Sequence, residues 1–255
     1  MRFLNSFKDS EKVNILSLGC GYDSTFFWLR ESHPELSAKM VYIEIDYDQV
    51  VNKKIETINK NAELSGKILE NSNPSCDYEI NSKNYKLFAH DVRKTELMGI
   101  KMNNQLGIDN NVPTLIMTEC LLCYLQNSDS DSILKWTNEY FAQAPFICLL
   151  NFEMIEPFDS FGQTMINNLR ERGCDLLGLE GCPNIAAQIQ RMNTNWGTNH
   201  VECETMEKVY REKLETEERK RIERLEMFDE FEEWVLLQSH YCLCFSKRFE
   251  ANVEA

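Results

Sequence analysis

The 255-residue sequence has no apolar stretch that approaches the roughly 20 residues needed for a membrane-spanning helix. Residues 1–11 also lack the continuous apolar run of a secretory signal. Basic residues are scarce, with 27 Lys and Arg against 41 Asp and Glu, and the formal net charge is -14 at pH 7. Because an acidic chain repels nucleic-acid phosphates, we expect protein or small-molecule partners and no nucleic acid. The lack of a long apolar stretch and of a secretory signal leads us to expect no membrane and a cytoplasmic location.

Patterns for metal binding and for serine hydrolysis are missing as well. Cys120 and Cys123 are spaced as a metal-binding pair, but zinc needs about four ligands and the four histidines form no local motif. No G-x-S-x-G turn occurs, so a serine hydrolase is not supported. We predict no metal, and we interpret the ten cysteines as reduced thiols, several of them buried. Cys242 and Cys244 should face the same side of a strand.

Short apolar runs alternate with helix-like stretches along most of the chain. Hydrophobic residues make up 43% of the sequence, enough for a packed core. We predict strands at residues 13–18, 40–45, 85–90, 113–118, 146–152 and 241–245. We predict helices at residues 23–30, 48–64 and 128–143, and a loop at 66–84. This alternation indicates βαβ units and a parallel sheet, hence an α/β fold.

The alternation stops in residues 158–226, which are mostly helix-like. The strand predicted at 241–245 would return to the sheet. We therefore interpret residues 1–255 as a single domain, with 158–226 as a helical insertion that forms a lid or acceptor region. The dense charges of residues 202–233 fit a solvated helix face.

A glycine-rich turn, Gly19-Cys20-Gly21, directly follows the first predicted strand. Glycine permits a tight turn and a close backbone approach to a ligand, and a helix that begins behind it offers unpaired N–H groups. The dinucleotide fingerprint needs a third glycine where this chain has Ser24, which weakens a nicotinamide-cofactor interpretation. Taken alone, the turn fits a structural role nearly as well as a binding role.

Acidic side chains follow three further predicted strands. Asp46 is placed to accept the ribose hydroxyls of an adenosine, or else to begin the next helix. Asp91 is placed for an adenine amino group, or else is an ordinary loop residue, and Glu119 ends the fourth strand. Because the carboxyl ends of parallel strands form one edge of a sheet, we expect these groups and the glycine turn to meet there.

With these motifs in place, the sequence resembles the leucine carboxyl methyltransferases over nearly all of residues 12–248. The segments that carry the resemblance are Gly19 to Thr25, Glu44 to Asp46, Thr118 to Tyr124, Phe161 to Arg170, Arg172 to Leu176, and His240 to Cys244. The resemblance implies a Rossmann-like S-adenosylmethionine-dependent methyltransferase sheet with a helical insertion before the last strands. It also implies an N-terminal Lys and Arg for the cofactor carboxylate. The only basic residues before Val13 in this sequence are Arg2, Lys8 and Lys12, and none of them lies in that motif.

The resemblance implies S-adenosyl-L-methionine as the cofactor. The cofactor-binding residues that it implies are Gly19, Gly21, Asp23, Asp46, Asp91, Val92 and Glu119. Among them, Gly19 would lie under the methionine part and Asp46 would bind the ribose. Asp91 and Val92 would hold the adenine, and Glu119 would contact the cofactor near the sulfonium. Arg93 and Tyr124 would be the catalytic residues on the acceptor side.

The acceptor that the resemblance implies is the C-terminal leucine of the catalytic subunit of protein phosphatase 2A. A terminal carboxylate, with an unperturbed pKa of about 3.5, is ionised at pH 7 and needs no general base. Two alternatives stay open: a catalytically silent homologue that binds the phosphatase or the cofactor, and a carboxyl methyltransferase of the tRNA wybutosine type. Gln163, Asn167 and Arg170 recur at helical spacing, which fits either substrate contact or simple exposure.

Overall fold

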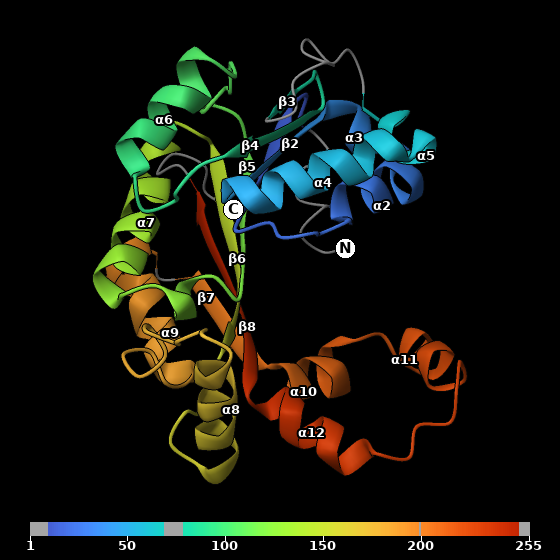
Figure 1. Ribbon diagram of the computed structural model, residues 1–255, viewed down its shortest axis with the longest axis vertical. Helices are drawn as coiled ribbons and strands as arrows, with labels where there is room; N and C mark the ends of the chain where they lie inside the picture. The colour runs from blue at the N-terminus through green and yellow to red at the C-terminus, as the bar shows by residue number, and fades with distance from the viewer. Residues whose placement is uncertain (1–9, 69–78, 199, 250–255) are drawn as a thin grey trace. The chain divides into compact units, whose positions relative to one another are not determined.

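The computed structural model describes residues 10–68, 79–198 and 200–249, which fall into two compact units (Figure 1). The first unit comprises Met1–Glu119, Ser132–Leu149 and Lys247–Ala255, and the second comprises Cys120–Asp131 and Leu150–Ser246. Arg2, Lys8 and most of the loop predicted at 66–84 lie outside the described residues. Within the described residues, no helix is long and apolar enough to cross a membrane.

A parallel sheet forms the centre of the first unit. Its strands are β1 (Val13–Leu18), β2 (Met40–Asp46), β3 (Glu79–Asn81), β4 (Tyr85–Ala89), β5 (Thr114–Glu119) and the beginning of β6 (Phe146–Met154). They lie in the order β3-β4-β2-β1-β5-β6. β1 pairs in parallel with β2 and β5, and β2 pairs in parallel with β4, whereas the short β3 runs antiparallel to β4. β1 is buried along its whole length, as expected for a strand covered on both faces.

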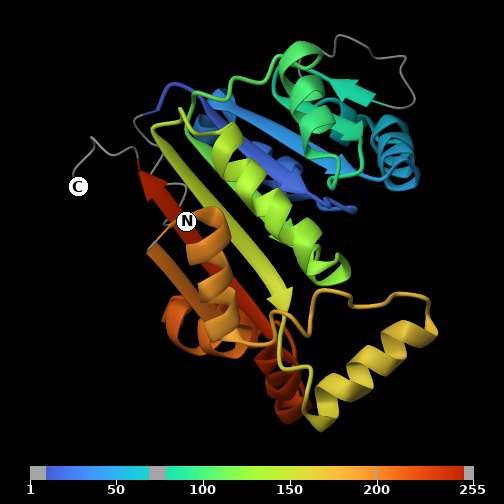
Figure 2. The same cartoon turned by 90° about the vertical axis from the view of Figure 1, so that its left-hand side faces the viewer.

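Helices cover both faces of this sheet. They are α2 (Thr25–Ser32), α3 (Pro34–Lys39), α4 (Asp48–Lys60), α5 (Ala62–Ser65), α6 (Thr95–Asn104) and most of α7 (Asn127–Tyr140). α2 to α5 lie on one face, and α6 and α7 lie on the other (Figures 1 and 2). Val51, Ile55 and Ile58 of α4 recur at helical spacing and are buried. The layered α/β architecture predicted from the alternation is therefore confirmed.

The second unit combines strand ends with most of the remaining helices. Its strands are the end of β6, then most of β8 (Tyr241–Phe249), then β7 (His200–Thr205). Its helices are α8 (Ser160–Glu171), α9 (Ile185–Arg191), α10 (Met206–Lys208), α11 (Thr216–Glu223) and α12 (Phe231–Ser239). The unit also contains a 3-10 turn, η1 (Leu122–Tyr124), and two π-helical turns, η2 (Met192–Trp196) and η3 (Val209–Lys213). β8 lies beside β6, so the predicted return of residues 241–245 to the sheet is confirmed.

Some elements differ from the sequence-based expectation. β3 lies within the predicted loop, β7 lies within the region predicted to be helical, and α6 was not predicted. The helix predicted at 48–64 is two helices, because the Asn61 side chain accepts hydrogen bonds from the Glu63 and Leu64 amides and begins α5. Residues 158–226 lie wholly in the second unit, and their description as an insertion in a single domain stays a prediction.

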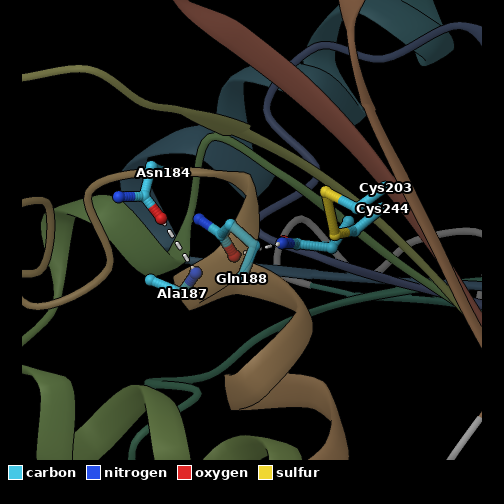
Figure 3. Close-up of a disulfide and its surroundings, with 6 residues drawn as sticks. Asn184, Ala187, Gln188, Cys203 and Cys244 are labelled. Atoms are coloured by element: carbon cyan, nitrogen blue, oxygen red, sulfur yellow. Dashed lines mark hydrogen bonds between the residues drawn. A yellow bond between two sulfur atoms is a disulfide. The ribbon is translucent and has the colours of Figure 1, made fainter.

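A disulfide joins β7 to β8, between Cys203 and Cys244 (Figure 3). The prediction of reduced cysteines is wrong for this pair. β7 was not foreseen, so nothing in the local sequence indicated that Cys203 would lie beside Cys244. Cys242 and Cys244 are both fully buried in one cluster with Ile155, as their alternate spacing predicted.

A buried polar cluster connects α4, β2 and β4 with the glycine-rich turn. Glu44 is completely buried, and its Oε2 lies 2.6 Å from the Nζ of Lys54 and accepts a hydrogen bond from the Tyr85 hydroxyl. The same Lys54 Nζ donates to the main-chain carbonyl of Asp23 at 2.7 Å. Burial raises the pKa of Glu44 to about 7, although Lys54 and Tyr85 oppose the shift. The cluster therefore fixes the turn through a carboxyl that titrates near neutrality.

This raised pKa makes the stability of the fold depend on pH. The unfolded chain releases the Glu44 proton near pH 4.5 and the folded chain near pH 7, so the folded state binds more protons between these values. The free energy of unfolding of the parent should therefore fall by about 3 kcal/mol across this window relative to Glu44→Gln. Urea unfolding at a series of pH values measures the two slopes. Parallel pH profiles would show that Glu44 is not the titrating group.

Candidate active site

The glycine-rich turn bends sharply at the carboxyl end of β1. Gly19 and Gly21 have φ values of 68° and 52°, in the left-handed region that glycine adopts without a side-chain clash. The amides of Gly19 and Cys20 both donate to the Ile45 carbonyl, at 2.9 and 3.2 Å. A Cβ built on Gly21 meets nothing within 4 Å, so the backbone here is open to a closely approaching ligand. The turn therefore has the shape of a nucleotide-binding corner.

Asp46, the predicted ribose residue, reaches this turn directly. Its Oδ2 accepts a hydrogen bond from the Gly21 amide at 2.8 Å, and its Oδ1 accepts one from the Tyr47 amide at 2.7 Å. The side chain is half-buried. A carboxylate has about four lone-pair sites, so these two bonds leave capacity for ribose hydroxyls. The structure thus brings together two of the predicted cofactor residues.

The Asp23 carboxylate is occupied by contacts within the protein. Its Oδ1 accepts hydrogen bonds from the amide and hydroxyl of Thr25, at 3.0 and 2.7 Å, and its Oδ2 accepts one from the Tyr42 hydroxyl at 3.1 Å. These bonds define the beginning of α2. Asp23 therefore shapes the turn, and its direct contact with a cofactor stays a prediction.

Asp91, Val92 and Arg93 follow β4 at the same edge of the sheet. The register sets Asp46 opposite Ala89, and the His90 amide donates to the Asp46 carbonyl at 2.9 Å. Val92 is buried and Arg93 is exposed. Arg93 binds Asp91 through two hydrogen bonds, Nε to Oδ1 at 2.9 Å and NH2 to Oδ2 at 2.8 Å. These bonds hold the pKa of Asp91 below its usual value.

Glu119 ends β5 and is exposed. The parallel register sets Leu18 of β1 opposite Thr118, so Glu119 extends past the same edge as the glycine turn. The four strand ends therefore carry glycine, Asp46, Asp91 and Glu119 along one edge of the first unit, as the sequence predicted.

Tyr124 belongs to the second unit, on the short turn η1. Its ring is half-buried and packs against the cluster of Cys123, Met154, Leu176 and Leu179. Burial raises the pKa of Tyr124 to about 12, so its hydroxyl is protonated at neutral pH and can donate a hydrogen bond. Its acceptor-side role stays a prediction.

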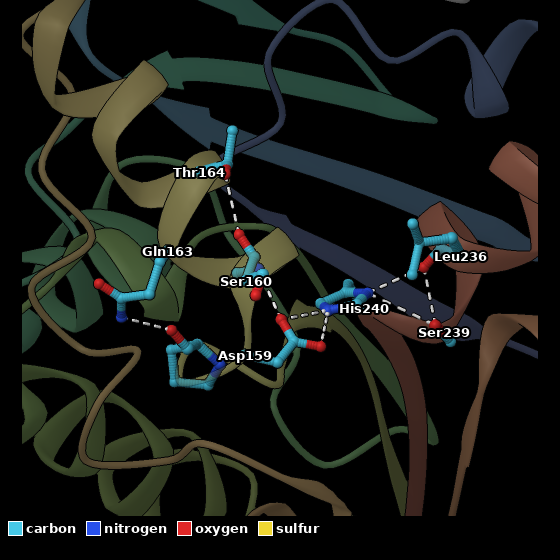
Figure 4. A network of polar contacts seen from close by, with 9 residues as sticks. Asp159, Ser160, Gln163, Thr164, Leu236, Ser239 and His240 are labelled. Atoms are coloured by element: carbon cyan, nitrogen blue, oxygen red, sulfur yellow. Dashed lines mark hydrogen bonds and ion pairs between the residues drawn. The ribbon is translucent and has the colours of Figure 1, made fainter.

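Helix α8 begins at a polar network that the sequence did not indicate (Figure 4). Asp159 caps the helix by accepting from the Gly162 amide at 2.7 Å, and its two oxygens lie 3.1 and 3.0 Å from the Nε2 of buried His240. The His240 Nδ1 lies 2.8 Å from the Leu236 carbonyl. The network joins the beginning of α8 to the end of α12, through His240 directly before β8. Gln163 of α8 is exposed, and its side chain donates to the Pro157 carbonyl.

Two buried carboxyl groups near the predicted site residues were also missed from the sequence. Glu44 supports the glycine turn through Lys54, and Glu153 accepts from the backbone that precedes Tyr124. A charged residue inside an apolar strand run was the available signal, since buried charges need partners. Across the described part of the chain, no group of three or more His, Cys, Asp or Glu residues is arranged to hold a metal ion.

Comparison with known proteins agrees with this geometry. Residues 2–138 match the family model of leucine carboxyl methyltransferase. The chain is 37% identical over 241 residues to "Leucine carboxyl methyltransferase 1 homolog" of Arabidopsis thaliana, covering 93% of this chain and 69% of that protein. It is 35% identical over 242 residues to "Leucine carboxyl methyltransferase 1" of Rattus norvegicus, covering 93% and 70%. It is also 33% identical over 245 residues to "tRNA wybutosine-synthesizing protein 4" of Rattus norvegicus, covering 93% and 34%.

Solved structures share the fold at much lower identity. An O-methyltransferase family protein from Burkholderia thailandensis superposes with a TM-score of 0.54 at 11% identity, covering 98% of this chain and 56% of that one. The CurJ carbon methyltransferase superposes with a TM-score of 0.51 at 12% identity, covering 95% and 50%. The fold is that of the S-adenosylmethionine-dependent methyltransferases. Within that class, the chain belongs to the leucine carboxyl methyltransferase family.

The Asp91–Arg93 pair can be tested by titration. Arg93→Ala removes the hydrogen bonds that lower the pKa of Asp91 most, so that pKa should rise toward its ordinary value. Lys94→Ala, which removes one weaker charge interaction, should produce a smaller rise. Carboxyl-carbon NMR shifts followed against pH measure both. An unchanged Asp91 pKa in Arg93→Ala would contradict the pairing.

Proposed function

We propose that this chain transfers the methyl group of S-adenosyl-L-methionine to the carboxylate of a protein's C-terminal leucine, that of the protein phosphatase 2A catalytic subunit. The proposal is carried by one observation: in this member of the family, the glycine turn, Asp46, Asp91 and Glu119 lie along one edge of the sheet. Ligands of open α/β sheets bind outside the carboxyl ends of the strands, where these residues lie. The names of the relatives supply the leucine acceptor.

The residues present suit the cofactor. The open space above Gly21 admits a ligand close to the backbone, so Gly19 and Gly21 would lie under the methionine part. Asp46 would bind the ribose with the lone pairs that its amide contacts leave. Asp91 and Val92 would hold the adenine, and Glu119 would lie near the sulfonium. When bound, the cofactor supplies an electrophilic methyl group on a positively charged sulfur.

The chain's own task is orientation and exclusion of water. The acceptor carboxylate is ionised at neutral pH, so no residue has to remove a proton. It is, however, a weak and strongly hydrated nucleophile, and orienting it can contribute on the order of 7–11 kcal/mol. Arg93 would pair with the carboxylate, and the protonated Tyr124 hydroxyl would donate a hydrogen bond to aim one oxygen. Held by Arg93 and Tyr124 in this way, that oxygen would face the methyl group that the bound cofactor would supply.

The similarity to tRNA wybutosine-synthesizing protein 4 favours one second candidate, carboxyl methylation of a modified tRNA base. The net charge of -14 disfavours it, because an acidic chain repels the RNA backbone. A catalytically silent homologue that binds the cofactor or the phosphatase is the third candidate.

A labelling assay separates these functions. The chain is incubated with methyl-labelled S-adenosylmethionine and one of three acceptors: the intact phosphatase catalytic subunit, that subunit without its C-terminal leucine, or tRNA that carries the modified base. Base-labile label that requires the leucine is the expected result, because a methyl ester hydrolyses readily. Label on tRNA alone would identify the second candidate, and cofactor binding without any label would identify the third.

The glycine turn offers a matched test of cofactor binding. Gly21 and Gly107 both have positive φ, and a Cβ on either meets nothing within 4 Å. Alanine at either position should therefore cost about 1–2 kcal/mol of stability from backbone strain. Only Gly21→Ala should weaken S-adenosylmethionine binding, by about tenfold or more. Calorimetric titration compares the two, and equal affinities in both variants would contradict the placement of the cofactor.

A further inference from the structure

The turn formed by residues 120–124, here the 120–124 turn, contains a strained backbone. Cys120 has a φ of 45°, a left-handed value that costs a residue with a side chain about 1–3 kcal/mol. Its amide is held by a 2.8 Å hydrogen bond to the Phe152 carbonyl. Such conformations persist only where the surrounding structure enforces them, and they gather at functional sites. The contacts around this turn therefore hold it against its backbone strain.

Glu153 of β6 provides the central contact. It is almost completely buried, and its Oε1 accepts from the Leu122 amide at 2.8 Å while its Oε2 accepts from the Cys123 amide at 3.2 Å. One carboxylate thus binds two successive main-chain N–H groups. A buried carboxylate without partners is costly, so the same bonds satisfy the charge and fix the orientation of the turn.

Two further residues hold the turn by donating hydrogen bonds to its main-chain carbonyls. The Ser130 hydroxyl donates to the Leu122 carbonyl at 3.0 Å, and the Gly178 amide donates to the Cys123 carbonyl at 2.9 Å. Gly178 lies so close that a Cβ added there would be 2.6 Å from the Leu122 oxygen. The backbone before Tyr124 therefore has little room to move.

We propose that Glu153 is a positioning residue that binds the Leu122 and Cys123 amides and thereby aims the Tyr124 hydroxyl at the acceptor carboxylate. The inference rests on the proposed function. Glu153 acts through the backbone of the turn and does not itself meet the substrate. The hydrophobic cluster around Tyr124 fixes the ring, and Glu153 fixes the main chain from which the ring projects.

The first test is Glu153→Gln. Glutamine keeps the size of the side chain, but its amide group presents donors to one of the two N–H groups, so the turn loses a hydrogen bond. We expect kcat for the leucine-ended acceptor to fall by roughly ten- to a hundredfold, since a misplacement near 1 Å has effects of this size. The KM for S-adenosylmethionine should change by less than about twofold, because the first unit carries the proposed cofactor residues.

A double-variant cycle tests whether the effect passes through Tyr124. Tyr124→Phe removes the hydroxyl, and in that background Glu153→Gln should lower kcat by less than about threefold further. An equal loss in both backgrounds would overturn the proposal, as would full activity of Tyr124→Phe alone. Ser130→Ala, a milder change that removes one hydrogen bond to the 120–124 turn, should show the same non-additivity and serves if Glu153→Gln does not fold.

Gln188→Met is the matched control. Gln188 of α9 is buried in the same unit and accepts a hydrogen bond from Asn151 (Figure 3). It should lower stability with kcat within about twofold of the parent. Amide hydrogen exchange at Leu122 and Cys123 and the NMR signals of the Tyr124 ring give a readout independent of activity. Both should change in Glu153→Gln and not in Gln188→Met.

The two proposals fail in different ways. If the parent leaves the leucine acceptor unlabelled, the proposed function is contradicted. The positioning role is contradicted if amide exchange and the Tyr124 ring signals are unchanged in Glu153→Gln, whether or not the parent is active. An active parent with additive losses contradicts the positioning role alone.

Discussion

The hydrogen bond from the Gly21 amide to the Asp46 carboxylate ties the turn after β1 to the end of β2. It requires the parallel register that sets Leu18 opposite Ile45, because a shift of one residue would turn every side chain to the other face. The same register carries Asp91 and Glu119 to this edge through β4 and β5. The proposed cofactor site is therefore a consequence of how four strands are aligned.

Buried carboxyl groups support predicted site residues in both units. Glu44 holds Lys54, which in turn binds the Asp23 carbonyl of the glycine turn. Glu153 binds the main chain before Tyr124. Glu44 acts through the side chain of Lys54 on α4, whereas Glu153 binds the amides of the 120–124 turn directly. In each case a carboxyl group removed from water is paired with donors, and this pairing helps to hold the backbone near a predicted site residue. This is a physical route by which residues outside the site set its geometry.

The chemistry of the proposed reaction fits the kind of residues present. Carboxyl methylation needs no base, and the predicted site residues are acids and an arginine in the first unit and a protonated tyrosine in the second. The Arg93–Asp91 bonds connect the proposed adenine and acceptor sides of the site, which the sequence assigned to separate tasks. The acidic chain and the family relationship both favour a protein acceptor over RNA.

The sequence by itself determined the strands β1, β2, β4, β5, β6 and β8, the glycine turn and the order of acids at the strand ends. These follow from local apolar runs and from the rule that parallel strands end at one edge. Only the tertiary structure decided the Cys203–Cys244 disulfide, the strand β7, the Asp159–His240 contact and the carboxylate of Glu153 beneath its turn. Most of these contacts join residues that are distant along the chain, and their distance and geometry are set by packing, which no local pattern encodes.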